Sequence, residues 1–219
     1  MIVKVLLVTL TVTACVAVPS NIVRPCNVKD NKCVRDNFAP NSRCNPNVRG
    51  FIPGQYTIKQ FRFEAPYFNA TYIDNNLIIS NHNNCFVSEF FFNLGSDVGV
   101  LTLDCPSLVL ESSRTLIQHA SFKEDTAYSF NYKGTYPLVR LTVNLPHANQ
   151  LDLCSAYTFA DVTALPIFNV NPNDQKTANF LSTDLTLMNI YEREAFFYRA
   201  NQLARYYINS MICDFGCNF

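Results

Sequence analysis

The cysteines are the residues of this chain best suited to chemistry, because a thiol can form a disulfide, bind a metal ion or exchange electrons. Cys213 and Cys217 lie close to the end of the sequence with three residues between them. A thioredoxin-type redox pair has two intervening residues and opens a helix, whereas this pair follows a predicted helix. A zinc site needs four nitrogen or sulfur ligands, and the histidines are far in sequence from one another. We therefore predict no metal and no cofactor, and we interpret the cysteines as structural.

The first residues indicate the compartment in which these thiols fold. Residues 1–17 hold one cation, Lys4, followed by an apolar run without acidic residues, which predicts a secretory signal peptide cleaved after Ala17. The alternative is a lipoprotein site of the bacterial type that ends at Cys15. Cleavage after Ala17 removes Cys15 and leaves an even number of cysteines. In an oxidising compartment these predict four disulfides of unknown pairing among Cys26, Cys33, Cys44, Cys85, Cys105, Cys154, Cys213 and Cys217.

Known catalytic motifs are missing from the sequence, including phosphate-binding glycine loops, the nucleophile elbow and the zinc-protease motif. His82, His119 and His147 are each interpreted as a surface histidine or a strand histidine with satisfied ring nitrogens, because a catalytic triad is recognised by its geometry. Glu192 and Glu194 are two residues apart on a predicted helix, so they should point to different sides rather than pair as acid and base. We predict that the protein is not an enzyme.

One covalent modification is predicted from the sequence. Asn69-Ala70-Thr71 is an N-glycosylation sequon, and its position beside Pro66 predicts an exposed turn. The triplet 83–85, which ends in cysteine, is a much weaker acceptor.

Apolar runs with period-two alternation or near-continuous hydrophobicity, bounded by turn residues, predict strands. In the run 138–145, Val139, Leu141 and Val143 fall on one face, and the intervening polar residues fall on the other. This alternation is typical of a strand with one solvated face, so we expect an antiparallel sheet. The predicted strands are 56–64, 76–80, 85–93, 98–104, 127–132, 138–145 and 151–159.

The periodicity changes near the end of the chain, where residues 189–212 predict an amphipathic helix of about six turns. Its function could be to form a ligand wall, but a core helix under a sheet is the favoured interpretation. The apolar positions are Phe197, Ala200, Ala204, Ile208 and Met211, and the opposite polar stripe is Glu194, Asn201, Arg205 and Asn209.

The sequence predicts a single domain. No linker, repeat or low-complexity tract interrupts residues 18–219, which we interpret as a single domain. Lys plus Arg and Asp plus Glu number 17 each, so the chain has no basic field that would attract nucleic acid or an anionic membrane. We expect an α+β fold in which an antiparallel sheet packs on the long C-terminal helix.

Longer strings resemble the fibrohexamerin family, the small glycoproteins of the lepidopteran silk fibroin complex. They include RPCNVKDNKC, FEAPYFNATYIDNNLI, HASFKEDTAYSF, LPIFNVNPNDQ, DLTLMNIYERE and ICDFGCNF. The resemblance implies secretion into the silk gland lumen and non-covalent association with the disulfide-linked fibroin heavy and light chains, which the family is thought to keep soluble during transport. Other family members carry Asn where Ser113 and Lys133 stand here, so two family sequons are absent.

The order of elements also resembles the juvenile-hormone-binding and takeout proteins, whose curved sheet wraps around a helix. This resemblance concerns the fold only. Two alternative functions remain open from the sequence. The first is a secreted carrier of an apolar small ligand, which would require a pocket of about 300–1,000 Å³. The second is a secreted enzyme of an unrecognised kind, which would require a cleft with converging titratable groups.

Overall fold

The computed structural model describes residues 25–93, 95–148, 150–183 and 185–217. The predicted signal peptide, the predicted cleavage site and Cys15 lie outside these residues.

The described residues form a seven-stranded antiparallel sheet in the order β1-β2-β4-β5-β6, with β3 also pairing with β4 and β7 also pairing with β5. The two long central strands, β4 and β5, pair along their whole length, and the shorter strands share their outer edges. The strands are β1 (Gln55–Ala65), β2 (Ala70–Ser80), β3 (Phe86–Asn93), β4 (Val98–Gln118), β5 (Thr126–Pro146), β6 (Tyr157–Val162) and β7 (Ile167–Pro172).

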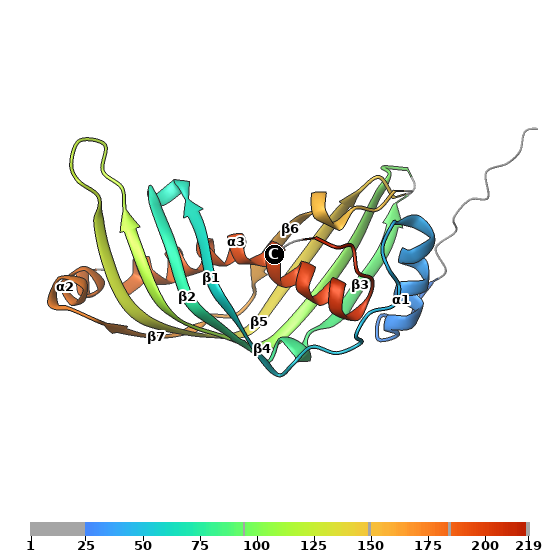
Figure 1. The fold of residues 1–219 in the computed structure, drawn as a ribbon, viewed down its shortest axis with the longest axis horizontal. Helices are drawn as coiled ribbons and strands as arrows, with labels where there is room; N and C mark the ends of the chain where they lie inside the picture. The colour runs from blue at the N-terminus through green and yellow to red at the C-terminus, as the bar shows by residue number, and fades with distance from the viewer. Residues whose placement is uncertain (1–24, 94, 149, 184, 218–219) are drawn as a thin grey trace, which may run out of the picture.

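The sheet is bent near its middle, and α3 (Leu185–Met211) crosses its concave side (Figure 1). Irregular backbone lies at the bend. The β2–β4 register shifts between Asn75 and Ile78, where Asn76 has a φ of 49°. In β4, Ser107 has a φ of 54°. Its neighbours Pro106 and Leu108 are both paired with residues of β5. The register shift in β2 is a β-bulge, which disrupts the ladder locally and increases the bend, and this lets one sheet wrap around one helix.

The strand predictions are confirmed in part. The predicted strands 76–80 and 98–104 are only parts of the longer β2 and β4, and β7 was not predicted. Two further differences concern β5 and β6. The runs 127–132 and 138–145 belong to one continuous strand, β5, in which Val139, Leu141 and Val143 are buried as predicted. The predicted strand 151–159 is wrong in its first half, because Leu153–Ser155 forms a 3-10 turn and β6 begins only at Tyr157. The Asp152 side chain accepts a hydrogen bond from the Cys154 backbone N–H at 2.8 Å and so stabilises this turn.

The predicted C-terminal helix is confirmed as α3, which begins four residues earlier than expected. Its predicted core positions Ala200, Ala204 and Ile208 are fully buried, while Phe197 and Met211 are only partly buried. The other helices are α1 (Asn31–Phe38) and α2 (Gln175–Thr183), and further 3-10 turns lie at Ala39–Asn41, Pro66–Phe68 and His82–Asn84.

The predicted polar stripe of this helix does not simply face solvent. Thr158 donates a hydrogen bond to Asn201 Oδ1 at 3.0 Å, and Arg205 Nη2 donates to the Cys154 carbonyl at 2.6 Å. Asn209 Oδ1 accepts from the Phe215 backbone N–H at 3.0 Å. The stripe therefore contacts β6, the 3-10 turn that precedes it and the returning C-terminal segment. Glu194 lies outside the described side chains.

The eight cysteines of the described residues are joined in four disulfides. Cys213 and Cys217, at the end of α3, are bonded to partners far away in the sequence, with separations of 169 and 63 residues. In the chain-entropy account, a bridge that closes so long a loop contributes on the order of 4–5 kcal/mol. The pairs are Cys26–Cys33, Cys44–Cys213, Cys85–Cys105 and Cys154–Cys217.

Candidate functional site

A cluster of four ionisable side chains lies between the sheet and α3. Arg114 Nε donates to Asp74 Oδ1 at 2.7 Å, and Arg199 Nη2 donates to Asp74 Oδ2 at 2.8 Å. Glu192 accepts a further hydrogen bond from Arg114 and lies 3.6 Å from Arg199 Nη1. All four side chains are at most 2 % exposed. Buried charges on this scale are tolerated only when they are paired, as they are here.

The local structure explains how these residues meet. Asp74 and Arg114 are direct cross-strand partners in the β2–β4 register. Glu192 and Arg199 are seven residues apart, which places them two turns apart on one face of α3. The sequence interpretation compared Glu192 only with Glu194 and missed this spacing. These two opposite charges lie two helical turns apart within an otherwise apolar helix face. That pattern in the sequence could have identified Glu192 and Arg199 as partners.

Aromatic rings enclose the cluster. The Arg114 guanidinium lies 3.9 Å from the centre of the Tyr132 ring, and Arg199 lies 5.2 Å from that of Phe63. Tyr132 and Tyr136 share a hydrogen bond of 2.5 Å between their hydroxyls, and burial raises the pKa of both. Burial also raises the pKa of Glu192, although the nearby Arg114 opposes that shift. The low dielectric thus strengthens each ion pair and penalises any unpaired charge.

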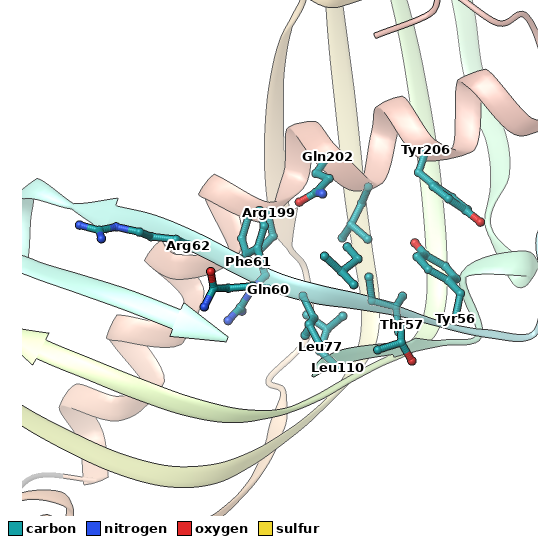
Figure 2. A pocket seen from close by; sticks show the side chains of 13 residues that line it. Tyr56, Thr57, Gln60, Phe61, Arg62, Leu77, Leu110, Arg199, Gln202 and Tyr206 are labelled. Atoms are coloured by element: carbon teal, nitrogen blue, oxygen red, sulfur yellow. The ribbon is translucent and has the colours of Figure 1, made fainter. Parts of the chain in front are cut away.

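A pocket of about 520 Å³ lies beside this cluster, between α3 and strands β1, β2 and β4. Tyr56 and Tyr206 stack at one end with their ring centres 4.3 Å apart. Arg199 borders the pocket from the helix side, facing Gln60 and Phe61 of β1 (Figure 2). The remaining wall is mainly aliphatic, and includes Ile58, Leu77, Ile79, Leu110 and Leu203.

The predicted sequon lies where β1 turns into β2. Asn69 is exposed, with a φ of 48°, and its side-chain amide donates to the His119 carbonyl at 2.9 Å. Thr71 is buried and forms a hydrogen bond of 2.7 Å with His119 Nε2, whose Nδ1 lies 2.7 Å from Asp125 Oδ2. These contacts join the β1–β2 turn to the β4–β5 connection.

The Thr71, His119 and Asp125 side chains have the connectivity of a hydrolase triad, but the hydroxyl is not placed for attack. The Thr71 hydroxyl donates its proton to Glu64, so that proton is not available to His119. At 1 % exposure, Thr71 is also closed to a substrate. The hydrogen bond from Thr71 lowers the pKa of Glu64, and that from His119 lowers the pKa of Asp125, so both carboxylates act as acceptors that order the turn.

The predicted glycosylation of Asn69 can be tested directly. Asn69→Gln should convert the secreted protein to a single faster-migrating band, because the acceptor amide would be absent. Asn76→Gln is the matched control, since Asn76 is exposed and also has a positive φ, 49°, but lies in no sequon. The two variants are compared by gel mobility with and without a glycosidase. A wild-type protein insensitive to the glycosidase would show that Asn69 is unmodified.

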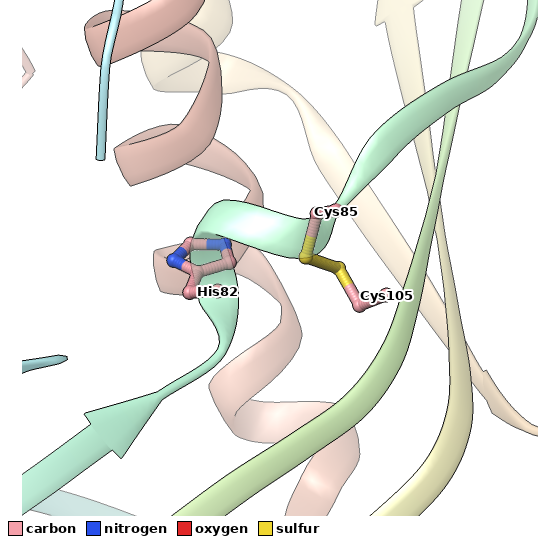
Figure 3. A group of neighbouring side chains, drawn as sticks. All are labelled: His82, Cys85 and Cys105. Atoms are coloured by element: carbon pink, nitrogen blue, oxygen red, sulfur yellow. A yellow bond between two sulfur atoms is a disulfide. The ribbon is translucent and has the colours of Figure 1, made fainter. Parts of the chain in front are cut away.

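One group of side chains within the described residues has the spacing of a metal site: His82, Cys85 and Cys105 (Figure 3). The two sulfurs are bonded to each other, so neither is available as a thiolate ligand. His82 Nδ1 forms a hydrogen bond of 2.8 Å with the Tyr56 hydroxyl, and burial lowers the pKa of His82 to about 4. The residues present therefore do not fit a metal ion.

The interpretation of the histidines as surface or satisfied strand residues is wrong for His82. This residue is fully buried in a 3-10 turn, and its Nε2 has no hydrogen-bond partner among the described residues. His147 is exposed and lies 3.4 Å from Asp97. Periodicity could not reveal the environment of His82, because α3 covers the turn only in the folded protein.

Comparison with known proteins establishes the family. The Fibroin P25 family model matches residues 22–217. The chain belongs to the fibroin P25 family. Fibrohexamerin of Galleria mellonella is a similar member, 60 % identical over 215 residues that cover 98 % of this chain and 99 % of that protein. Fibroin P25 is a family of silk proteins rather than of enzymes, and the resemblance found in the sequence is confirmed.

The fold of this fibroin P25 protein is shared with a solved structure. The crystal structure of Epiphyas postvittana Takeout 1 matches with a TM-score of 0.53 and covers 85 % of this chain and 94 % of that chain. The sequence identity is 10 %, so the match concerns the fold alone. The predicted α+β fold, with an antiparallel takeout-like sheet on a long helix, is confirmed.

A search of the described part of this fibroin P25 protein for helices able to cross a membrane finds none that is both long and apolar enough.

Proposed function

We propose that this protein is a secreted, chaperone-like subunit of the silk fibroin complex. The mature chain, residues 18–219, would fold as one domain in the silk gland lumen and associate non-covalently with disulfide-linked fibroin heavy and light chains. The observation that carries this proposal is family membership across residues 22–217, together with the close relationship to a fibrohexamerin. In this proposal, the subunit aids the solubility, transport and secretion of its partners.

The disulfide pattern supports non-covalent association. Each of the eight cysteines between residues 26 and 217 is used within the chain. Binding to fibroin chains would then depend on surface complementarity, in which aromatic anchors contribute strongly.

A surface suited to such binding lies on β6 and α3. Tyr157 and Phe159 are 56 % and 50 % exposed, and their rings lie 5.8 Å and 6.2 Å from that of Phe197. Tyr198 adds a fourth partly exposed ring, 5.7 Å from Phe197. A contiguous group of exposed aromatic residues is typical of a protein-binding surface.

Purification of the native silk-gland complex tests the proposal. This chain should co-purify with the fibroin chains, and on a denaturing, non-reducing gel it should migrate alone near its own mass while the heavy and light chains stay linked. A reducing gel of the same sample is the control, because it should separate all three chains. A band in which this chain is covalently attached to a partner, or a complex that lacks it, would contradict the proposal.

A second candidate function is transport of an apolar small ligand. The pocket beneath α3 favours it, because about 520 Å³ with a mainly aliphatic and aromatic wall is within the size range of small-molecule sites.

A further inference from the structure

The pocket beneath α3 has one buried cation in its wall. Arg199 is 2 % exposed, and its Nη2 is used by Asp74. Its Nε and Nη1 have no hydrogen-bond partner among the described residues, and the distance of 3.6 Å from Nη1 to Glu192 Oε2 is too long for a hydrogen bond. A buried donor without an acceptor is unfavourable, so an acceptor supplied by a ligand would be bound favourably.

The charge of the neighbouring cluster favours an anionic acceptor. Two guanidinium groups, of Arg114 and Arg199, face the carboxyl groups of Asp74 and Glu192. Arg114 forms hydrogen bonds with both carboxyl groups, whereas Arg199 forms one with Asp74 alone. Arg199 therefore has N–H groups left for a further acceptor, and a carboxylate forms a stronger hydrogen bond with a guanidinium than a neutral acceptor does.

The rest of the pocket wall is mainly apolar, so it favours the hydrocarbon part of a ligand. Leu77 and Ile79 of β2 and Leu110 of β4 lie opposite Leu203 of α3, and the Tyr56–Tyr206 stack closes one end. Arg62 also borders the pocket, but its side chain is 62 % exposed and paired with Glu64 at 2.9 Å. An exposed, paired cation attracts a ligand anion weakly, so Arg199 is the group that would orient the ligand.

We propose that this pocket binds an apolar molecule with a terminal carboxylate, such as a fatty acid. The carboxylate accepts a hydrogen bond from an unpartnered N–H group of Arg199, and the hydrocarbon lies along the aliphatic wall between β1, β2 and α3. This inference rests on the second candidate function, ligand transport, and it adds the chemical class of the ligand and the residue that selects it.

The test compares two probes of equal chain length, dodecanoate and dodecanol, by titration calorimetry at a pH at which the acid is ionised. The full-length secreted protein should bind dodecanoate roughly tenfold to a hundredfold more tightly, because the alcohol oxygen can still accept a hydrogen bond from Arg199 but lacks the negative charge that strengthens it. Arg199→Met should remove this preference and leave dodecanol binding. Lys59→Met is the matched control, since it removes an exposed cation of β1 that does not border the pocket, and it should change neither affinity.

A second variant keeps the test decisive if Arg199→Met does not fold. Ile58→Trp narrows the aliphatic part of the pocket without touching the ion cluster and should weaken both probes at least tenfold. Equal affinities of wild-type protein for the two probes would overturn the role of the carboxylate while leaving ligand transport intact. No binding of either probe would overturn both. A preference for dodecanoate that persists in folded Arg199→Met, or binding that is unaffected by Ile58→Trp, would exclude this site.

Discussion

Arg114→Met is expected to lower the free energy of unfolding by about 3–5 kcal/mol, because it leaves Asp74 and Glu192 buried with only Arg199 to compensate them. The loss would be measured by denaturant unfolding of the purified, disulfide-intact protein. It is a large fraction of the stability of a typical domain, about 5–15 kcal/mol, so a lower secreted yield is also expected.

Lys133→Met is the matched control for this substitution. Lys133 of β5 pairs with Glu111 of β4, the strand that also carries Arg114, at 3.2 Å, but both side chains are about half exposed. Exposed pairs contribute at most about 1 kcal/mol, so this variant should unfold almost like the wild type. Similar losses in the two variants would mean that burial of the cluster contributes little to the effect.

Acidification is expected to destabilise the protein through His82. Its pKa is lowered from 6.5 to about 4 by burial, so between those values the unfolded chain binds more protons than the folded one. The contribution is therefore fully present above pH 6.5 and is lost as the pH falls toward 4. This lowering of the His82 pKa, from 6.5 to about 4, corresponds to roughly 3 kcal/mol.

His82→Gln isolates this effect, because glutamine is neutral throughout and the carboxylates titrate equally in both proteins. Unfolding free energies would be measured for both proteins from pH 7 to pH 4, and the wild type should lose roughly 3 kcal/mol more than the variant over this range. The variant is expected to be less stable at neutral pH, since the hydrogen bond between His82 and Tyr56 changes, but that offset does not depend on pH in this interval. Parallel curves for the two proteins would show that His82 does not carry the acid sensitivity.

Several features could be predicted from the sequence because they depend on neighbouring residues. The alternation of Val139, Leu141 and Val143 is a local property of a strand with one buried face, and the structure buries these residues. The recurrence of Ala200, Ala204 and Ile208 likewise predicts the buried stripe of α3, whose backbone hydrogen bonds are all short-range.

The candidate site was less accessible to such reasoning. Glu192 was interpreted only against its near neighbour in the sequence, whereas its partner Arg114 is 78 residues away. Asp74 and Arg114 meet because the pairing register of β2 with β4 places them directly opposite each other. A shift of that register by one residue would place the two side chains on opposite faces of the sheet.

By itself, the sequence of this protein determined its family, the periodic segments that become strands and helix, the eight cysteines that follow the predicted signal peptide and the position of the sequon. The tertiary structure alone decided which cysteines pair, that four charged residues meet under α3, and that a pocket with a buried arginine lies beside them. The physical reason is that periodicity and parity are properties of one stretch of chain, whereas ion pairs and cavities arise where distant segments pack. The energies of those contacts depend on burial, which exists only once the sheet has curved around the helix.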